Sequence, residues 1–436
     1  MRSDSLVIFA TNDLSGITRG RAVPRSDTAL HMQCGVSWVP ANLGITALGP
    51  IAPNPWGPLG DLRLIPDPST EIHIDLWEDA SPFNLFLCDI VHTDGSEFDA
   101  CPRSFLKTAL SDLYEESGLR VQASFEHEFH LANVENGPCR AFGLDGYRLT
   151  EPFGPNVMTA LRLARQEPEV FMTEYAANQF EVTVRSATGL IAADRAVLVR
   201  EIVREVARRL GNRASFTPMV EPKGTGNGVH IHFSLNDSSG ACNYDENNQG
   251  KISTIAGQFI AGILHYLPAM VALTCPSDIS YLRLRPDHWS AAFNAFDSNN
   301  REAAVRICPT VTIGDASRSP QFHFEFRAVD GAASPYIALG VMVRAGLEGI
   351  RSGMKTPPLT EGHPGSLSED ERTQLGIRTL PTSLETALQE MEKSAIVSGW
   401  LSADMLDCYT RLKRYEMSML EGYDDLAKCR RYMEAY

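Results

Sequence analysis

The sequence predicts an α+β protein in which a small β-rich domain precedes a larger mixed domain. Three observations support this class. Short apolar runs separated by Pro and Gly fill the first hundred residues, a pattern typical of strands joined by turns. Longer segments with helical spacing of apolar residues follow, interleaved with strands in which polar and apolar residues alternate. The length of 436 residues is enough for about two or three domains.

The first predicted domain comprises residues 1–97. Three of its apolar runs have the length and flanking turns of strands: residues 62–65, 72–76 and 85–90. The Asp94-Gly95 turn and then Pro102 interrupt the pattern, and such breakers mark a boundary between units. The second domain is therefore expected to comprise residues 98–436.

Five segments of the second domain have apolar residues at helical spacing. We expect helices over residues 102–113, 194–210, 252–273, 384–393 and 403–417. The first of these begins at a proline, which is favoured in the first turn of a helix. Residues 355–371 are rich in Pro, Ser and Gly, so we expect a surface loop there.

Four predicted strands carry an unusual polar face. They comprise residues 124–130, 179–185, 229–234 and 322–327. Because residues at i and i+2 of a strand point to the same side, the polar faces hold Glu126, Glu128 and His130; Gln179, Glu181, Thr183 and Arg185; His230, His232 and Ser234; His323, Glu325 and Arg327. An ordinary sheet with one face in water would explain any one strand. Four faces with no Lys favour a functional cavity instead.

The residue types on these faces indicate a particular chemistry. Carboxylates outnumber imidazoles and no thiolate lies on these faces, which favours Mg²⁺ or Mn²⁺ over zinc. The pair His230-x-His232 could hold zinc, but the helical H-E-x-x-H motif is absent. The arginines beside the strands suit carboxylates and phosphates: Arg283, Arg301, Arg306 and Arg327. Divalent metal ions and arginines together stabilise the negative charge of a transferring phosphoryl group.

Composition narrows the function further. The 39 Lys and Arg against 54 Asp and Glu give a net charge of −15, which argues against a nucleic-acid partner. The nine cysteines include no C-x-x-C pair, so we expect a reduced, cytoplasmic protein. The apolar run at the N-terminus is too short for a signal peptide, and no apolar run approaches the ~20 residues of a membrane span.

A glycine-rich segment, residues 224–228, leads directly into the His230 strand. It matches neither the G-x-x-x-x-G-K-[ST] nor the G-x-G-x-x-G phosphate loop. Two interpretations remain open. The segment is either a hairpin loop that needs positive φ angles or a backbone that lets a ligand approach closely beside the metal.

Taken in order, the motifs of this chain resemble those of the glutamine synthetase family, in its γ-glutamyl-amine ligase branch (γ-glutamylpolyamine or γ-glutamylanilide synthetases). They are residues 13–21 (DLSGITRGR), 66–70 (PDPST), 125–129 (FEHEF), 178–181 (NQFE), the glycine segment before His230, Asn300-Arg301 with Arg306, and residues 324–327 (FEFR) followed by Asp330. The resemblance covers almost the whole chain.

The resemblance implies a small N-terminal β-grasp domain and a catalytic domain with a curved antiparallel sheet flanked by helices. It implies a homo-oligomeric double ring, expected to be a dodecamer, with active sites between neighbouring subunits. The implied reaction uses ATP to phosphorylate the γ-carboxylate of glutamate, after which a nitrogen nucleophile displaces the phosphate.

The resemblance also assigns roles to residues. The first metal would be held by Glu128, Glu174 and Glu181, and the second, at the ATP phosphates, by Glu126, His230 and Glu325. Two or more Mg²⁺ or Mn²⁺ ions are implied. Glutamate would be bound by Gly226, Thr225 and Arg283, with Arg327 at its reacting end. Arg301 and Arg306 would neutralise the transferring phosphate. The nucleotide would lie near His232, Ser234 and His323.

Several departures from the family pattern concern the nucleophile. Trp289 stands where ammonia-using members carry a Glu that binds ammonium and takes its proton, and residues 35–42 lack the Asp that partners this Glu. Two further departures concern other parts of the site. Thr225 occupies a glutamate-contacting position that is usually Asn, and His323 replaces an Arg on the nucleotide side. We therefore expect a ligase that joins glutamate to an organic amine, which is a polyamine, an alkylamine or an aromatic amine, with Trp289 and Trp38 lining the amine pocket.

The apolar character of these residues favours a less charged amine. Two alternatives stay open. One is a true glutamine synthetase in which another carboxylate, such as Asp287, replaces the missing one. The other is a non-catalytic regulatory relative.

Overall fold

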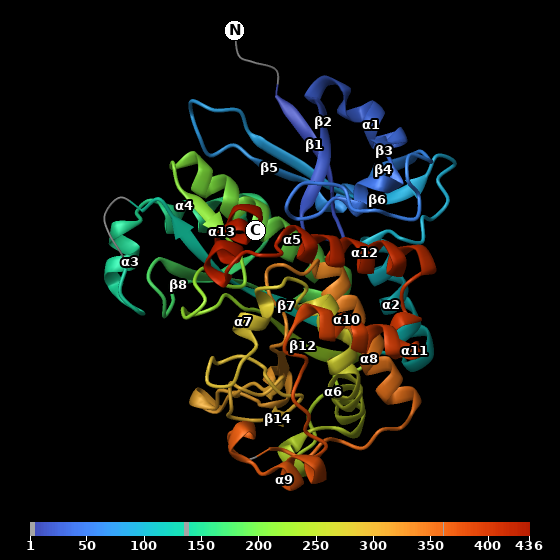
Figure 1. Ribbon diagram of the computed structural model, residues 1–436. Helices are drawn as coiled ribbons and strands as arrows, with labels where there is room; N and C mark the ends of the chain where they lie inside the picture. The colour runs from blue at the N-terminus through green and yellow to red at the C-terminus, as the bar shows by residue number, and fades with distance from the viewer. Residues whose placement is uncertain (1–4, 135–138, 361) are drawn as a thin grey trace.

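The computed structural model describes residues 5–134, 139–360 and 362–436. Residues 1–4 of the expected first domain and residue 361 of the expected 355–371 loop lie outside the described residues. The chain forms two sheets. The strands of the first sheet gather at one end of the molecule, and the helices and strands of the second sheet form the rest (Figure 1).

The N-terminal sheet has the order β2-β1-β6-β4-β3, with β5 beside β6. Its strands are β1 (Leu6–Asn12), β2 (Thr18–Pro24), β3 (Val36–Trp38), β4 (Leu62–Pro66), β5 (Ile72–Ile74) and β6 (Phe83–His92), with helix α1 (Thr28–Cys34). Neighbours are antiparallel except β1 and β6, which are parallel. The three strands expected from sequence correspond to β4, β5 and β6, although β5 ends two residues early.

The catalytic sheet has the order β14-β15-β16-β12-β7-β9-β8, with β10 and β11 beside β7 and β13 beside β12. Its strands are β7 (Arg120–Ala132), β8 (Pro168–Thr173), β9 (Gln179–Val184), β10 (Ala187–Thr188), β11 (Arg213–Ser215), β12 (Val229–Asp237), β13 (Gly240–Ala241), β14 (Phe296–Asp297), β15 (Val305–Ile307) and β16 (Phe324–Phe326). The sheet is antiparallel as expected, except that β14 and β15 are parallel.

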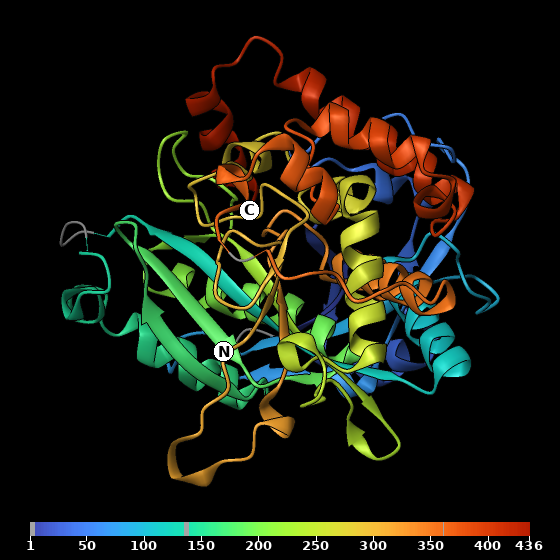
Figure 2. The same cartoon turned by 90° about the horizontal axis from the view of Figure 1, so that it is seen from below.

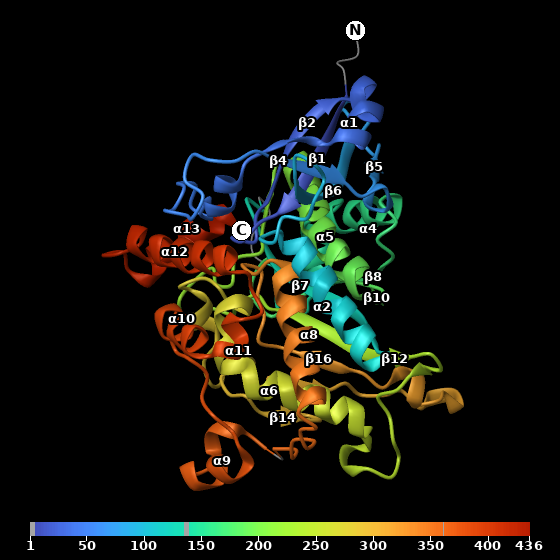
Figure 3. The ribbon, with the colours of Figure 1, turned by 90° about the vertical axis from the view of Figure 1, so that its right-hand side faces the viewer.

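Helices cover the apolar side of this sheet. Those in the core are α2 (Pro102–Ser117), α5 (Gly189–Arg209), α6 (Thr254–Thr274) and α8 (Pro335–Arg351). Helix α5 packs on β7, and α8 packs on α2, α5 and α6 (Figure 3). The remaining helices are α3 (Leu144–Leu149), α4 (Phe153–Leu163), α7 (Ser280–Arg283), α9 (Glu369–Leu375), α10 (Leu384–Lys393), α11 (Ala395–Ser398), α12 (Ala403–Met419) and α13 (Asp425–Ala435). The last two, drawn in red, lie along one side of the molecule (Figure 2).

The fold class and the five expected helices are confirmed, with shifted ends. Helix α5 begins at Gly189, five residues before the expected start. The expectation of a loop throughout residues 355–371 is wrong at its end, because α9 begins at Glu369. There the Ser368 side chain accepts from the Glu371 N–H while the Glu371 carboxylate accepts from the Ser368 N–H, and such a reciprocal cap stabilises a helix start.

Helix α6 corrects the expectation that no segment is apolar enough to cross a membrane. It has 21 residues, and its most apolar window has a mean hydropathy of 1.5. However, 78% of that window is buried inside the molecule, and the helix packs against α8 and α10. Its apolar character is therefore that of a core helix.

Candidate active site

The register of the catalytic sheet brings the expected polar faces together. Strand β12 lies between β7 and β16, so that His230 pairs with Glu126 and His232 with Glu325. On the other side of β7, Glu128 pairs with Glu181 of β9. Directly opposite side chains on one face of a sheet are about 5 Å apart. The sheet therefore places these polar residues next to one another, as a single site would require.

One cluster on this face centres on His230. Its Nδ1 lies 3.3 Å from Glu126 Oε2 and 3.3 Å from Glu325 Oε1. Burial, followed by the nearby Arg327 charge, lowers the pKa of His230 to about 4. A neutral imidazole between two carboxylates can ligate a divalent cation. These are the residues expected to hold the metal at the ATP phosphates.

A second cluster holds Glu128, Glu174 and Glu181. Burial raises the pKa of Glu128 to about 7, with the Glu174 charge adding to the shift and the Gly228 N–H opposing it. Burial and the charges of the other carboxylates raise the pKa of Glu181, and burial and Glu126 raise that of Glu174. Glu181 Oε1 is buried without a hydrogen-bond partner among the described residues. Buried like charges with an orphaned oxygen fit a divalent cation, which would supply the missing counter-charge.

The raised carboxylate pKa values predict a pH-dependent effect of metal on stability. Because the folded pKa of Glu128 exceeds its unfolded value of about 4.3, its contribution to the stability of the metal-free protein is complete below that value. The contribution is lost as the pH rises through about 7. We expect the Tm in EDTA to fall between about pH 5 and about pH 8, and Mg²⁺ to raise the Tm more at the higher pH. A Mg²⁺-induced rise in Tm that is the same at both pH values would contradict this.

Two of the expected arginines pair with a carboxylate of the site. Arg306 donates from Nε to Glu325 Oε2 at 2.6 Å, and Arg327 pairs with the same carboxylate through its other oxygen. Burial raises the pKa of Glu325, but the charges of His230 and Arg327 outweigh it and lower the value to about 2. Arg327 also donates to the carbonyls of Arg301 and Trp289. The Arg301 side chain is exposed.

The glycine segment approaches these carboxylates closely. The Gly228 N–H donates to Glu128 Oε2 at 2.8 Å, and Gln179 Nε2 donates to the Gly226 carbonyl at 2.9 Å. A Cβ on Gly226 would lie 2.6 Å from the Arg283 side chain. None of the three glycines has a positive φ, so the positive-φ interpretation is wrong. Close packing explains Gly226 and Gly228. The half-buried Thr225 adjoins Gly226.

The expected nucleotide-side residues lie at the other end of the face. His232 and Ser234 are half-buried on β12, and the half-buried His323 immediately precedes β16. His232 Nδ1 lies 3.1 Å from His323 Nε2. His232 Nε2 lies 2.8 Å from Glu126 Oε1, so this pair of imidazoles adjoins the His230 cluster.

The two tryptophans expected in the amine pocket lie in different environments. Trp289 is 63% exposed, and its ring centroid lies 6.4 Å from that of Tyr175, which directly follows Glu174. Trp38 is 5% exposed in the core of the N-terminal domain. The expectation for Trp38 is therefore wrong, because apolar packing takes up its side chain.

Sequence reasoning missed three residues that the structure brings to the site. Glu302 is 5% exposed, its Oε1 accepts from the Trp289 N–H at 2.6 Å, and its Oε2 has no hydrogen-bond partner among the described residues. His363 Nε2 lies 4.0 Å from Glu302 Oε2 and 3.4 Å from Asp287 Oδ1. Cys308 follows β15 and contacts His232. None of them lies on a predicted strand face, so the alternation of polar and apolar residues did not indicate that they belong to the site.

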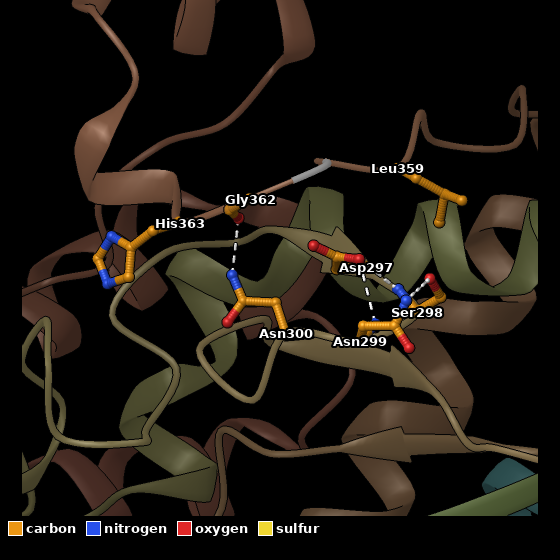
Figure 4. A pocket seen from close by; sticks show the side chains of 7 residues that line it. All are labelled: Asp297, Ser298, Asn299, Asn300, Leu359, Gly362 and His363. Atoms are coloured by element: carbon orange, nitrogen blue, oxygen red, sulfur yellow. Dashed lines mark hydrogen bonds between the residues drawn. The ribbon is translucent and has the colours of Figure 1, made fainter.

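A cavity of about 570 Å³ lies next to residues 297–300, which directly precede Arg301 (Figure 4). Its walls are residues 297–300 and the loop that carries Leu359, Gly362 and His363. Asn300 donates from its side-chain amide to the Gly362 carbonyl at 2.7 Å. This bond links the two walls beside the segment that carries Arg301.

Two linked carboxylate clusters flanked by arginines contain the residue types that metal-dependent phosphoryl transfer uses. Comparison with known proteins gives the family. The catalytic-domain family of glutamine synthetase matches residues 99–432, and the N-terminal-domain family matches residues 1–98. The chain belongs to the glutamine synthetase family, and it is an ATP-dependent carboxylate–amine ligase.

Named relatives include proteins with different nucleophiles. A γ-glutamylpolyamine synthetase, GlnA3 of Streptomyces coelicolor, is 31% identical over 438 residues, covering 96% of this chain and 91% of that protein. A glutamine synthetase of Methanocaldococcus jannaschii is 31% identical over 366 residues, covering 82% and 79%. A crystal structure described as a glutamine synthase homologue has a TM-score of 0.92 and 39% identity, covering 100% and 99% of the two chains. Identity alone therefore does not select the amine.

Proposed function

We propose that this ligase joins the γ-carboxylate of glutamate to an organic amine, through a γ-glutamyl phosphate. The observation that carries the proposal is the environment of Trp289. An exposed Trp–Tyr pair occupies the position at which ammonia-using relatives have a carboxylate. An aromatic pair offers apolar contact to a carbon chain and a π face to a cation. Ammonium has no carbon atoms for such a surface to contact.

Different residues would bind the metal ions, glutamate and the nucleotide. Glu128, Glu174 and Glu181 would hold one Mg²⁺ or Mn²⁺ ion, and Glu126, His230 and Glu325 a second. These ions would neutralise charge on the ATP phosphates during transfer. Gly226, Thr225 and Arg283 would bind glutamate, with Arg327 at the γ-carboxylate. Arg301 and Arg306 would neutralise the transferring phosphoryl group, and His232, Ser234 and His323 would face the nucleotide.

We propose Glu302 as the carboxylate that receives the proton of the amine. It contacts the Trp289 backbone, and the carbonyl of Trp289 accepts from Arg327. Burial raises the pKa of Glu302, while the Trp289 N–H and His363 oppose the shift. A carboxylate with a raised pKa is a better base near neutral pH. Asp287, the alternative considered from sequence, has an 87% exposed side chain, which supplies no comparable desolvation.

The assembly and location of the enzyme follow from family membership as further proposals. We propose a homododecameric double ring with active sites between subunits, in the cytoplasm. Sedimentation velocity of the purified protein tests the ring. A species of the mass of one chain at working concentration would contradict it.

The function is tested by phosphate release from ATP with Mg²⁺ and glutamate, against ammonia and a panel of polyamines, alkylamines and anilines. We expect release with one amine class and little with ammonia. Release with ammonia alone would instead identify a glutamine synthetase. Absence of phosphate release with every nucleophile would favour a regulatory relative. Ligand binding that is unchanged after metal removal would support that alternative.

Trp289→Glu tests the amine surface directly. We expect KM for the preferred amine to rise by about tenfold or more, because the aromatic contact is lost, and turnover with ammonia to appear. Trp289→Phe is the matched control, because it keeps an aromatic face and should keep the amine preference. An unchanged preference in Trp289→Glu would exclude Trp289 from the amine pocket.

A further inference from the structure

Three metal-ligand side chains converge beyond the two carboxylate clusters. His232 is on β12, Cys308 directly follows β15 and His323 directly precedes β16. The Cys308 N–H donates to the His323 carbonyl at 3.0 Å, which extends the pairing of β15 with β16 by one residue. The His232 Nδ1, Cys308 Sγ and His323 Nε2 atoms lie within 4.8 Å of one another.

Neighbouring groups fix which nitrogen of each imidazole faces this point. His323 Nδ1 lies 2.6 Å from the Gln321 carbonyl oxygen, which can only accept, so Nδ1 carries a proton and Nε2 is the nitrogen turned toward the other two side chains. His232 Nε2 lies 2.8 Å from a Glu126 oxygen, which leaves Nδ1 as the nitrogen turned toward Cys308 and His323. A carboxylate or carbonyl behind the imidazole is the usual support of a metal-bound histidine.

The separations between these atoms suit a shared ligand. His232 Nδ1 and His323 Nε2 are 3.1 Å apart, and the Cys308 sulfur lies 3.5 Å from His232 Nδ1. A cation at the centre would satisfy all three groups. With Zn–N of about 2.05 Å and Zn–S of about 2.3 Å, a tetrahedral ion separates two nitrogens by about 3.3 Å and a nitrogen from sulfur by about 3.6 Å. The two separations measured from His232 Nδ1 differ from these by a few tenths of an ångström or less.

We propose that His232, Cys308 and His323 form a binding site for a borderline-soft divalent cation of the Zn²⁺ class. Two imidazoles and a thiolate disfavour Mg²⁺, which prefers oxygen ligands. The site uses none of the six residues proposed to hold Mg²⁺, although His232 Nε2 contacts Glu126. Two of its ligands, His232 and His323, are also residues proposed to face the nucleotide. Three protein ligands leave a fourth position for water or another oxygen ligand. The bound ion would connect β12, β15 and β16, and binding to the folded state alone would stabilise the protein.

Cobalt titration tests the site, because thiolate-bound Co²⁺ has a charge-transfer absorption in the near ultraviolet and oxygen-bound Co²⁺ does not. Full-length protein is first saturated with Mg²⁺ to occupy carboxylate sites. We expect one Co²⁺ per chain to produce this absorption, and stoichiometric Zn²⁺ to remove it and raise the Tm. The readout does not depend on ligase activity, so it stands or fails separately from the proposed function.

Two variants remove ligands by different means. Cys308→Ser should abolish the absorption, and His323→Arg, which keeps a cationic side chain, should weaken Co²⁺ binding by about tenfold or more. Cys34→Ser is the matched control, because Cys34 is an exposed thiol in the N-terminal domain, and its absorption should be unchanged. Absence of the absorption in the wild type, or its persistence in Cys308→Ser, would overturn the proposal. If Cys308→Ser does not fold, undiminished affinity in His323→Arg would overturn it instead.

Discussion

Glu128→Gln is expected to lower kcat/KM for amine-dependent phosphate release at least about 100-fold, since loss of even an outer-shell partner of a metal ligand costs 10- to 100-fold. Glu128 supplies one of three carboxylates whose mutual repulsion a bound cation would relieve. The amide has nearly the same volume, so the change removes a charge without opening a cavity. The measurement is steady-state phosphate release at several Mg²⁺ concentrations, with each nucleophile that the wild type accepts.

A second readout separates metal binding from folding. Removing the Glu128 charge relieves repulsion with Glu174 and Glu181, so the metal-free variant should be at least as stable as the wild type, and Mg²⁺ should raise its Tm less. Glu169→Gln is the matched control, because Glu169 lies on the neighbouring β8 with a half-exposed carboxylate paired to Arg185. Near-normal turnover in Glu128→Gln at low Mg²⁺ would refute its assignment as a metal ligand.

The polar faces could be predicted because strand alternation is local. In an antiparallel sheet, which side Glu126, Glu128 or Glu325 faces depends only on its position along its own strand. The residue types then indicate a metal and phosphate site before any pairing is known. The order of the strands was not available from alternation. Resemblance to a family grouped Glu128 with Glu181 and Glu126 with His230, and the register of β7 with β9 and β12 places each of these pairs side by side.

Residues outside regular strands could not be placed in this way. Glu302 and Cys308 meet the site through the parallel β14–β15 connection and the segments around it, which have no periodic pattern. Alternation also indicated that no thiolate lies on the polar faces, although Cys308 contacts His232 from beyond the end of β15. The prediction for Trp38 was wrong for a different reason. The sequence around a tryptophan does not distinguish a side chain packed in a core from one that lines a pocket.

Glu302→Gln is expected to lower kcat about 100-fold with amines that are protonated at neutral pH, the lower end of what a positioned base contributes. Such an amine must lose its proton before it can attack the acyl phosphate. The amide keeps the size of Glu302 and can still accept from the Trp289 N–H, but it cannot take a proton. The Oε2 of Glu302 is buried without a hydrogen-bond partner among the described residues, and we propose that this oxygen takes the proton.

The basicity of the amine distinguishes a base from a merely structural carboxylate. An aniline is neutral at pH 7, so its turnover should fall much less than that of an alkylamine in Glu302→Gln. Raising the pH should recover part of the alkylamine rate, because solvent then removes the proton. Glu302→Asp, which keeps a carboxylate, should retain more of the alkylamine rate than Glu302→Gln. An equal loss with anilines and alkylamines at every pH would show that Glu302 only holds the Trp289 backbone, and the base would then lie elsewhere.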